Sequence, residues 1–137
     1  TSYNCFHATM DVTLMGKRTF DEIAGMDGVE SVYPTTKNYI FTHAERLPVN
    51  GFIPVAEDVV AFVRSIPSDK NVWVIGGNQL MAPLLDSDMI DTMIIKVSPV
   101  LLGDGIPLFT QKDALKRFTL EEVNHYGQFA EMVYRKI

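Results

Sequence analysis

A glycine pair at the end of an apolar segment carries the strongest chemical signal in this sequence. The run Val72–Ile75 is rich in β-branched and aromatic residues, and it ends at Gly76-Gly77. Apolar residues then recur at helical spacing from Leu80 onward. Glycine has no Cβ, so a ligand can approach its backbone closely, and a helix N-terminus offers N–H groups and partial positive charge. The pattern predicts a site for a phosphorylated ligand; the alternative is a tight turn.

A second segment of the same kind lies upstream. The apolar run Val12–Met15 ends at Gly16, and Lys17, Arg18 and Thr19 follow it directly. Arginine can bind a phosphate through two parallel hydrogen bonds, whereas lysine acts as a point charge. Because the cations and the hydroxyl coincide with an expected helix start, we interpret this segment as a second phosphate contact. The alternative is a strand-to-helix turn with two solvated cations.

The composition limits the classes of function that the chain can have. Its 137 residues suit one domain, and the hydrophobic content of 47% with 21% charged residues is that of an ordinary globular protein. A net charge of −5 argues against nucleic acid or a membrane surface as the partner. No apolar run reaches the roughly 20 residues of a membrane span. The single cysteine, Cys5, excludes an internal disulfide and favours a cytoplasmic location.

The expected elements alternate between strands and helices through the middle of the chain. This order predicts an α/β fold, a three-layer αβα sandwich with a mainly parallel sheet and a C-terminal antiparallel hairpin, in a single domain over residues 1–137. We expect strands at Val12–Met15, Asn38–Thr42, Gly51–Val55, from Val72, and at Thr92–Val100, with a hairpin of Phe118–His125 and Gln128–Lys136. We expect helices at Ser2–Met10, Arg18–Ala24, Glu57–Ile66 and Asn78–Leu85.

Other chemistry-bearing residues do not form recognisable sites. His7 and His125 stand apart from any cysteine or carboxylate at ligand spacing, so no metal site is predicted. Asp86, Asp88 and Asp91 fall in an expected turn after a helix and are interpreted as solvated acids. No arrangement of nucleophile and base is evident, so the sequence names no catalytic residue.

Four segments together resemble the dihydrofolate reductase-like fold. They are Leu14–Phe20, Tyr39–Thr42, Val74–Leu80 and Ser98–Phe109. They resemble more closely the riboflavin biosynthesis reductases, which form the C-terminal domain of a bifunctional deaminase-reductase. The segment Ser98–Phe109, with its Gly103-Asp104-Gly105 loop, is the most specific to that branch.

The resemblance implies a reductase that binds NADPH and transfers hydride to a pterin-like or 5-amino-6-(5-phosphoribosylamino)uracil-like heterocycle. It implies a cis peptide bond between the two glycines of the pair. The residues that would contact the cofactor are Gly16, Lys17, Arg18, Thr19, Thr42, His43, Ile75, Gly76, Gly77, Asn78, Gln79 and Leu80. Among them, Thr42 and His43 would flank the adenosine 2′-phosphate, and Asn78, Gln79 and Leu80 would present a helix N-terminus.

The sequence departs from the family pattern at three places. Asn78 stands where the family often has a third glycine, and its side chain can still cap the helix. Ile75 stands where the riboflavin-pathway reductases usually have glutamate, which argues against the ribosyl-phosphate pyrimidine as substrate. The family's first strand, which should precede residues 2–10, is missing from the N-terminus of the chain. The alternative function is therefore a non-catalytic nucleotide- or pterin-binding protein that keeps the reductase fold. The resemblance also implies a homodimer, for which the segment Met89–Ile95 is a candidate contact.

Overall fold

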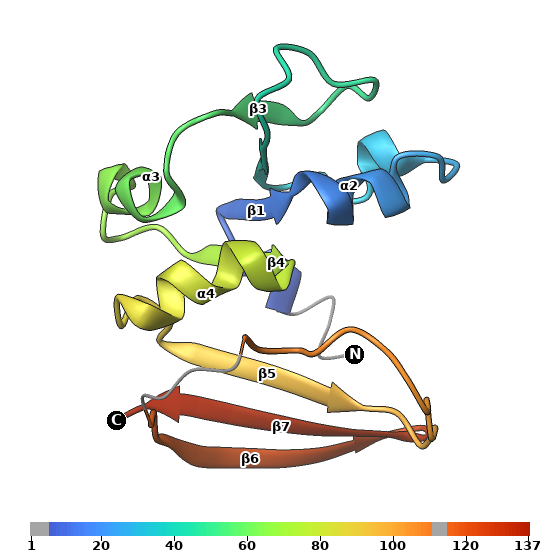
Figure 1. Ribbon diagram of the computed structural model, residues 1–137, viewed down its shortest axis with the longest axis vertical. Helices are drawn as coiled ribbons and strands as arrows, with labels where there is room; N and C mark the ends of the chain where they lie inside the picture. The colour runs from blue at the N-terminus through green and yellow to red at the C-terminus, as the bar shows by residue number, and fades with distance from the viewer. Residues whose placement is uncertain (1–5, 111–114) are drawn as a thin grey trace. The chain divides into compact units, whose positions relative to one another are not determined.

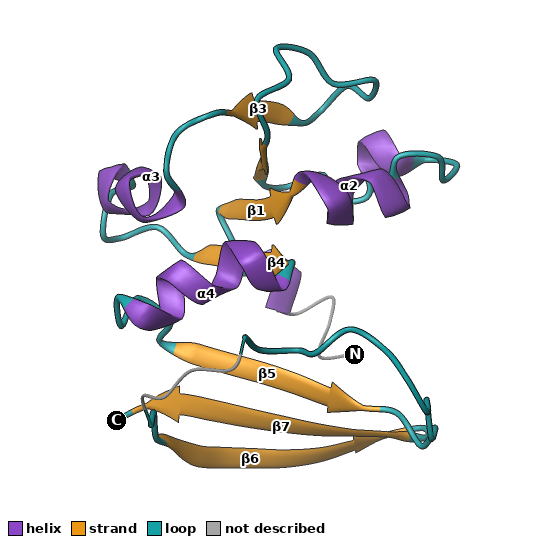
Figure 2. Ribbon diagram, viewed as in Figure 1, coloured by secondary structure: helices purple, strands orange, loops and turns teal. Residues whose placement is uncertain are grey.

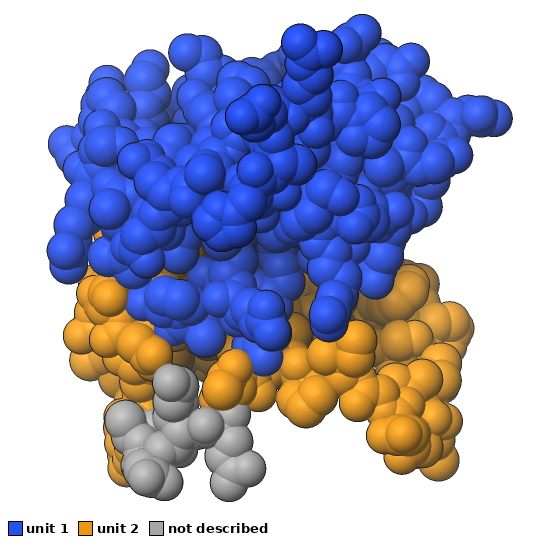
Figure 3. Space-filling view, turned by 45° about the horizontal axis from the view of Figure 1, so that its top comes forward, with its two compact units in different colours: residues 1–83 blue, residues 84–137 orange. Residues whose placement is uncertain are grey.

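The computed structural model describes residues 6–110 and 115–137, which form two compact units, 1–83 and 84–137 (Figure 3). The expected helix at Ser2–Met10 lies partly outside the described residues; within them, residues 6–8 are helical. Cys5 also lies outside the described residues. No helix in the described part of the chain is long and apolar enough to cross a membrane.

The first unit is built on a four-stranded parallel sheet in the order β3-β2-β1-β4 (Figure 1). Its strands are β1 (Val12–Gly16), β2 (Lys37–Phe41), β3 (Ile53–Val55) and β4 (Val72–Gly76). Its helices are α2 (Lys17–Ile23), α3 (Val59–Ser65) and the first part of α4 (Asn78–Asp86), with a short 3-10 turn at Val29–Ser31 (Figure 2).

Successive side chains of a strand point to opposite faces of the sheet, so β1 and β2 contribute to an apolar layer on each face. On one face Met15 and Ile40 pack with Phe20 of α2 and with Val29 and Phe52 from the following loops, all at most 7% exposed. On the other face Tyr39 and Phe41 pack against Phe62 of α3, with ring centroids 4.8 and 5.4 Å apart. Helices therefore cover both faces of the parallel sheet, as the alternating sequence pattern predicts.

A polar side chain, Asn38, connects the sheet to the loops that cover it. Its amide nitrogen donates to the carbonyl oxygens of Tyr33 and Gly51, at 3.1 and 3.2 Å. Its amide oxygen accepts from the hydroxyls of Thr13, at 2.7 Å, and Thr36, at 2.6 Å. Because every polar atom of this buried side chain has a partner, it fixes two loops against the strands without leaving an unsatisfied group.

The second unit is a three-stranded antiparallel sheet in the order β5-β7-β6. Its strands are β5 (Thr92–Val97), β6 (Phe118–Tyr126) and β7 (Phe129–Lys136). The predicted C-terminal hairpin is confirmed. In the described residues it pairs with β5 in a sheet of its own, rather than with a strand of the parallel sheet.

A proline, a glycine and a helix cap account for three boundaries that differ from those expected. β5 ends at Val97 instead of Val100, before the segment that contains Pro99, a residue that cannot donate to a strand ladder. The hairpin turns at Gly127-Gln128, one residue later than expected, with Gly127 at φ 56°. α3 begins at Val59 because Asp58 caps it, accepting from the Ala61 N–H at 3.0 Å.

Candidate functional site

The carboxyl ends of the four parallel strands lie at one edge of the sheet. Gly16 at the end of β1 pairs with Phe41 of β2, and Met15 pairs with Gly76 of β4. The segments that follow β1, β2 and β4 therefore begin side by side, which is where open α/β sheets bind their ligands. The predicted site residues lie in these segments, or at the strand ends that lead into them, and all belong to the first unit.

The glycines of the two segments face each other across β1 and β4. A Cβ on Gly16 would lie 3.6 Å from the Gly77 nitrogen and 3.8 Å from the Gly76 carbonyl oxygen. Gly76 has φ 144°, a conformation that side chains rarely adopt, and the Gly76-Gly77 peptide bond is cis, as the resemblance implies. The structure thus brings together two motifs that are 60 residues apart in the sequence.

The hydroxyl of Thr19 reaches the same place from α2. Its Oγ1 would be 3.4 Å from a Cβ on Gly77 and 3.9 Å from one on Gly76. The α2 side chain that approaches both glycines of the pair is therefore Thr19. A hydroxyl both donates and accepts, so it can bind either a polar ligand group or the adjoining peptide.

Helix α4 starts immediately after the glycine pair. The Gly77 carbonyl accepts hydrogen bonds from the N–H groups of Leu80, at 3.2 Å, and Met81, at 3.0 Å. Only positions before Leu80 in this first turn can therefore offer N–H groups to a ligand, and the Leu80 side chain is buried. No acidic side chain lies in the first turn, so the positive end of the helix dipole is not neutralised there.

An irregularity in β4 positions the glycine pair. The register with β1 shifts between Leu14, which pairs with Val74, and Met15, which pairs with Gly76. The extra residue is Ile75, whose side chain packs against the apolar cluster that contains Met15. The Ile75 side chain is half-buried there. Such irregularities are frequent next to functional sites because they redirect the backbone.

The two cations that follow Gly16 differ in their surroundings. The Lys17 ammonium lies 2.5 Å from Asp21 Oδ1 and 5.9 Å from the centroid of the Phe20 ring. Arg18 is exposed, and among the described residues it has no ion-pair partner. The sequence analysis assigned both cations to the cofactor phosphates, with arginine as a two-hydrogen-bond contact and lysine as a point charge. Asp21 was not among its site residues, although its spacing of four from Lys17 on a helix was a visible signal.

Thr42 and His43 follow β2 at the same edge. The Thr42 N–H donates to the Val55 carbonyl at 2.8 Å, and its Oγ1 accepts from the Ala44 N–H at 3.1 Å. The hydroxyl therefore stabilises the turn after the strand, while His43 is exposed beside it. Both residues follow Phe41, which pairs with Gly16 at the end of β1.

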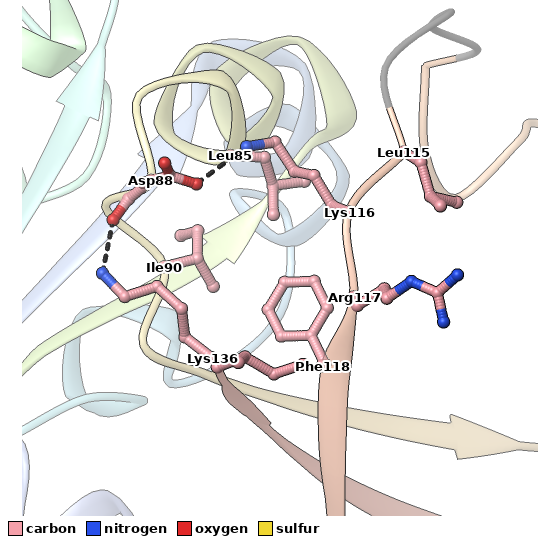
Figure 4. A pocket seen from close by; sticks show the side chains of 9 residues that line it. Leu85, Asp88, Ile90, Leu115, Lys116, Arg117, Phe118 and Lys136 are labelled. Carbon is pink, nitrogen blue, oxygen red and sulfur yellow. Dashed lines mark hydrogen bonds and ion pairs between the residues drawn. The ribbon is translucent and has the colours of Figure 1, made fainter.

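A cavity of about 690 Å³ in the second unit is a further candidate (Figure 4). Lys116 and Lys136 line it, but both bind Asp88: Lys116 Nζ lies 2.8 Å from the carboxylate and Lys136 Nζ lies 2.7 Å from the carbonyl oxygen. The Lys116 ammonium holds the pKa of the Asp88 carboxyl below its ordinary value. Arg117 projects away from Asp88 in Figure 4. Both lysines bind the turn after α4, Lys136 from β7 and Lys116 from the segment before β6. The stronger candidate for a ligand site is therefore the carboxyl end of the parallel sheet.

No group of three or more histidine, cysteine, aspartate or glutamate side chains that could hold a metal occurs in residues 6–110 or 115–137. The edge of the parallel sheet offers glycine backbone, a hydroxyl, cations and a helix N-terminus instead. This set of groups suits the binding of a phosphorylated ligand rather than metal or nucleophilic chemistry.

The sequence matches a protein-family model and is similar to an uncharacterized bacterial protein. The family model of the RibD C-terminal domain matches residues 31–130, which include the glycine pair and α4 but begin after Thr19. The uncharacterized protein YwjB of Bacillus subtilis (strain 168) is 29% identical over 135 residues, covering 96% of this chain and 77% of YwjB.

Two crystal structures share the fold. A proposed riboflavin biosynthesis protein from Shewanella sp. PV-4 matches with a TM-score of 0.84 and 22% identity, over 100% of this chain and 80% of that one. RibD of Acinetobacter baumannii matches with a TM-score of 0.71 and 18% identity, over 98% of this chain and 49% of RibD. The chain thus spans about half of that RibD, and the fold expected from the resemblance is confirmed. Because the family model covers most of its length, the chain belongs to the RibD C-terminal domain family.

Proposed function

We propose that this protein is an NADPH-dependent reductase that transfers hydride to a pterin-like or aminouracil-like heterocycle. One observation carries the proposal: Gly16, the Gly76-Gly77 pair and the Thr19 hydroxyl converge at the carboxyl edge of the parallel sheet, directly before the N-terminus of α4. Membership of the RibD C-terminal domain family supports the same reading.

The space above Gly16 is consistent with a bound dinucleotide. Gly16 has φ −75° and ψ 157°, which any residue adopts, and a Cβ there would make only ordinary contacts. Neither the backbone nor the packing of the protein itself therefore requires glycine at this position. A ligand that lies against the backbone would require it, because a methyl group would occupy the ligand's place.

The chain's own residues would bind and orient the cofactor, which when bound supplies the hydride. Arg18 would contact its phosphates, and the first turn of α4 would add N–H groups and positive potential. Thr42 and His43 would lie toward the adenosine 2′-phosphate. Holding the reacting groups together is the main task that remains for the protein, and the accompanying proton is expected from water.

One observation favours the alternative, a binding protein without catalysis. The first residues of α2 and α4, Lys17 to Thr19 and Asn78 to Leu80, include no carboxylic acid that could donate a proton. The two functions differ in a single respect that can be measured. A nucleotide-binding protein would bind NADPH and a pterin-binding protein would bind a dihydropterin, but only the reductase oxidises NADPH when a dihydropterin or an aminouracil is added.

Titration of NADPH and NADH against Trp73 fluorescence tests the site. We expect saturable NADPH binding that weakens in Arg18→Ala by about 1–3 kcal/mol, the range for a lost hydrogen bond to a charged group. A variant that binds as tightly as the wild type would remove Arg18 from the site. Absence of binding by the wild-type protein at millimolar cofactor would contradict the proposed function.

A second pair of variants separates ligand binding from folding. Gly16→Ala should keep the thermal stability of the wild type but lose NADPH affinity, because the methyl group intrudes on the ligand alone. Gly25→Ala is the matched control, since a Cβ at that position meets nothing within 4 Å. Equal affinities of the two variants would place the cofactor elsewhere.

The assembly state remains a prediction. We propose a homodimer, and exposed apolar side chains in the second unit, such as Leu101 and Ile106, are consistent with a protein contact. Sedimentation equilibrium of the purified protein measures the mass directly, and a monomer at all concentrations would contradict the proposal.

A further inference from the structure

Lys17, the residue that follows Gly16, forms an ion pair with Asp21 on the same helix, α2. Lys17 Nζ is 2.5 Å from Asp21 Oδ1, and the same ammonium lies over the ring of the buried Phe20. Both contacted residues, Phe20 and Asp21, belong to α2, the helix that begins at Lys17. In this structure the Lys17 ammonium therefore contacts side chains of its own helix.

Arg18, the next residue, has no such restraint. Its side chain is exposed, and no described residue forms an ion pair with it. Of the two cations that follow Gly16, one is thus held by a carboxylate and the other is available. An anion that binds beside Gly16 would meet a full positive charge from Arg18 and a largely compensated one from Lys17.

The restraint on Lys17 is weak enough to be adjustable. The side chains of Lys17 and Asp21 are 39% and 56% exposed, and exposed pairs contribute little to stability. The pair also has the less favourable helical orientation, with the cation N-terminal to the acid. Removing the carboxylate should therefore release the lysine without unfolding the helix.

We propose that Asp21 is a positioning residue that holds Lys17 back from the cofactor phosphates, so that Arg18 supplies most of the charge contact and affinity stays below its attainable limit. This inference rests on the proposed NADPH site. Asp21 acts through Lys17 and does not itself touch the cofactor.

A double-mutant cycle on the full chain tests this role. NADPH and NADH dissociation constants are measured for the wild type, Asp21→Asn, Lys17→Ala and the double variant, with thermal unfolding as the check on folding. Glu22→Gln is the matched control, because it removes the same charge from the next position on α2, and no ion pair joins Glu22 to Lys17. Repeating each titration at high salt shows whether the gain is electrostatic.

We expect Asp21→Asn to tighten NADPH binding about two- to fivefold, the range set by releasing an exposed ion pair. Lys17→Ala should weaken binding less than Arg18→Ala does, and in the double variant the gain should disappear. The proposal is overturned if the gain persists without Lys17 or if Glu22→Gln tightens binding equally, since either result reflects net charge alone. It is also overturned if Asp21→Asn leaves the dissociation constant unchanged. Wild-type protein that binds neither cofactor would instead contradict the proposed function itself.

Discussion

The parallel and antiparallel sheets of this protein are stabilised in different ways. In the parallel sheet Leu14, Phe20 and Ile40 are completely buried around the strands that lead to the candidate site. In the antiparallel sheet Glu131 is the one buried residue of the three strands, all of which the structure describes. Ion pairs, such as those of Arg135 with Glu121 and Lys96 with Glu131, cross its strands instead.

This difference indicates which unit can hold a ligand precisely. Apolar burial contributes about 25 cal/mol per Å² and is insensitive to salt, whereas exposed ion pairs contribute little and are screened. A site for hydride transfer needs its groups fixed within a fraction of an ångström. β1, which ends at Gly16, has the buried apolar packing that such a site requires, and β4, whose side chains before Gly76 are half-buried, pairs with it.

The largest expected effect comes from truncating an aromatic side chain in each sheet. Phe20→Ala should lower the free energy of unfolding by about 3–5 kcal/mol, because the side chain is fully buried. Phe129→Ala, at a position that is 46% exposed, should cost less than about 1 kcal/mol. Urea unfolding followed by circular dichroism measures both. Similar losses in the two variants would mean that the sheets do not differ as described.

A smaller difference is expected for two asparagines. Asn38 is 6% exposed and satisfies two carbonyls and two hydroxyls, so Asn38→Ala should cost about 2–3 kcal/mol. Asn124 is half-buried and donates at 3.2 Å to Glu122 and Glu131, so Asn124→Ala should cost about 1 kcal/mol. The same unfolding measurement applies. A larger loss for Asn124→Ala would show that polar contacts organise the antiparallel sheet more strongly than we infer.

The smallest effect concerns pH in the antiparallel unit. A hydrogen bond from Lys116 lowers the pKa of Asp88, and one from Arg135 lowers the pKa of Glu121. A lowered folded-state pKa means that each pair contributes fully above the ordinary values, 3.8 and 4.5, and that the contribution is lost as pH falls through the folded-state pKa. Nuclear magnetic resonance titration of the carboxyl carbons measures these pKa values.

In each variant the carboxyl of the unchanged ion pair serves as the control for the titration of the other. Lys116→Gln should raise the pKa of Asp88 toward 3.8 and leave Glu121 unchanged, while Arg135→Gln should do the reverse. If either variant moved both carboxyls together, the two ion pairs would act as one network rather than as separate surface contacts.

Local sequence patterns were sufficient for most of the elements. The apolar runs before Gly16 and Gly76 and the stripe on α3 predicted their strands and helix, because each pattern is confined to neighbouring residues. Val29 and Phe52 were not predicted as core residues. Val29 lies in the short 3-10 turn and Phe52 directly before β3, and only the folded chain brings them onto the face of the sheet formed by Met15 and Ile40.

In the candidate site, too, some features could be predicted from the sequence and others could not. The glycines, the cations and Thr19 were identifiable because a glycine between a strand and a helix has a physical meaning in the sequence. The pairing of Lys17 with Asp21 was not anticipated, although the spacing was present. A spacing of four permits an ion pair on a helix but does not decide whether the lysine points to the acid or to a ligand.

By itself, the sequence determined the α/β class, the order of the elements and the two glycine segments, since these depend on periodicity and on the absence of a Cβ. The tertiary structure alone decided that the two segments meet, because a parallel register joins residues that are far apart in the chain. It also decided that Ile75 is the extra residue of β4 and that the hairpin pairs with β5. Pairing and register arise from long-range packing, which no local pattern encodes.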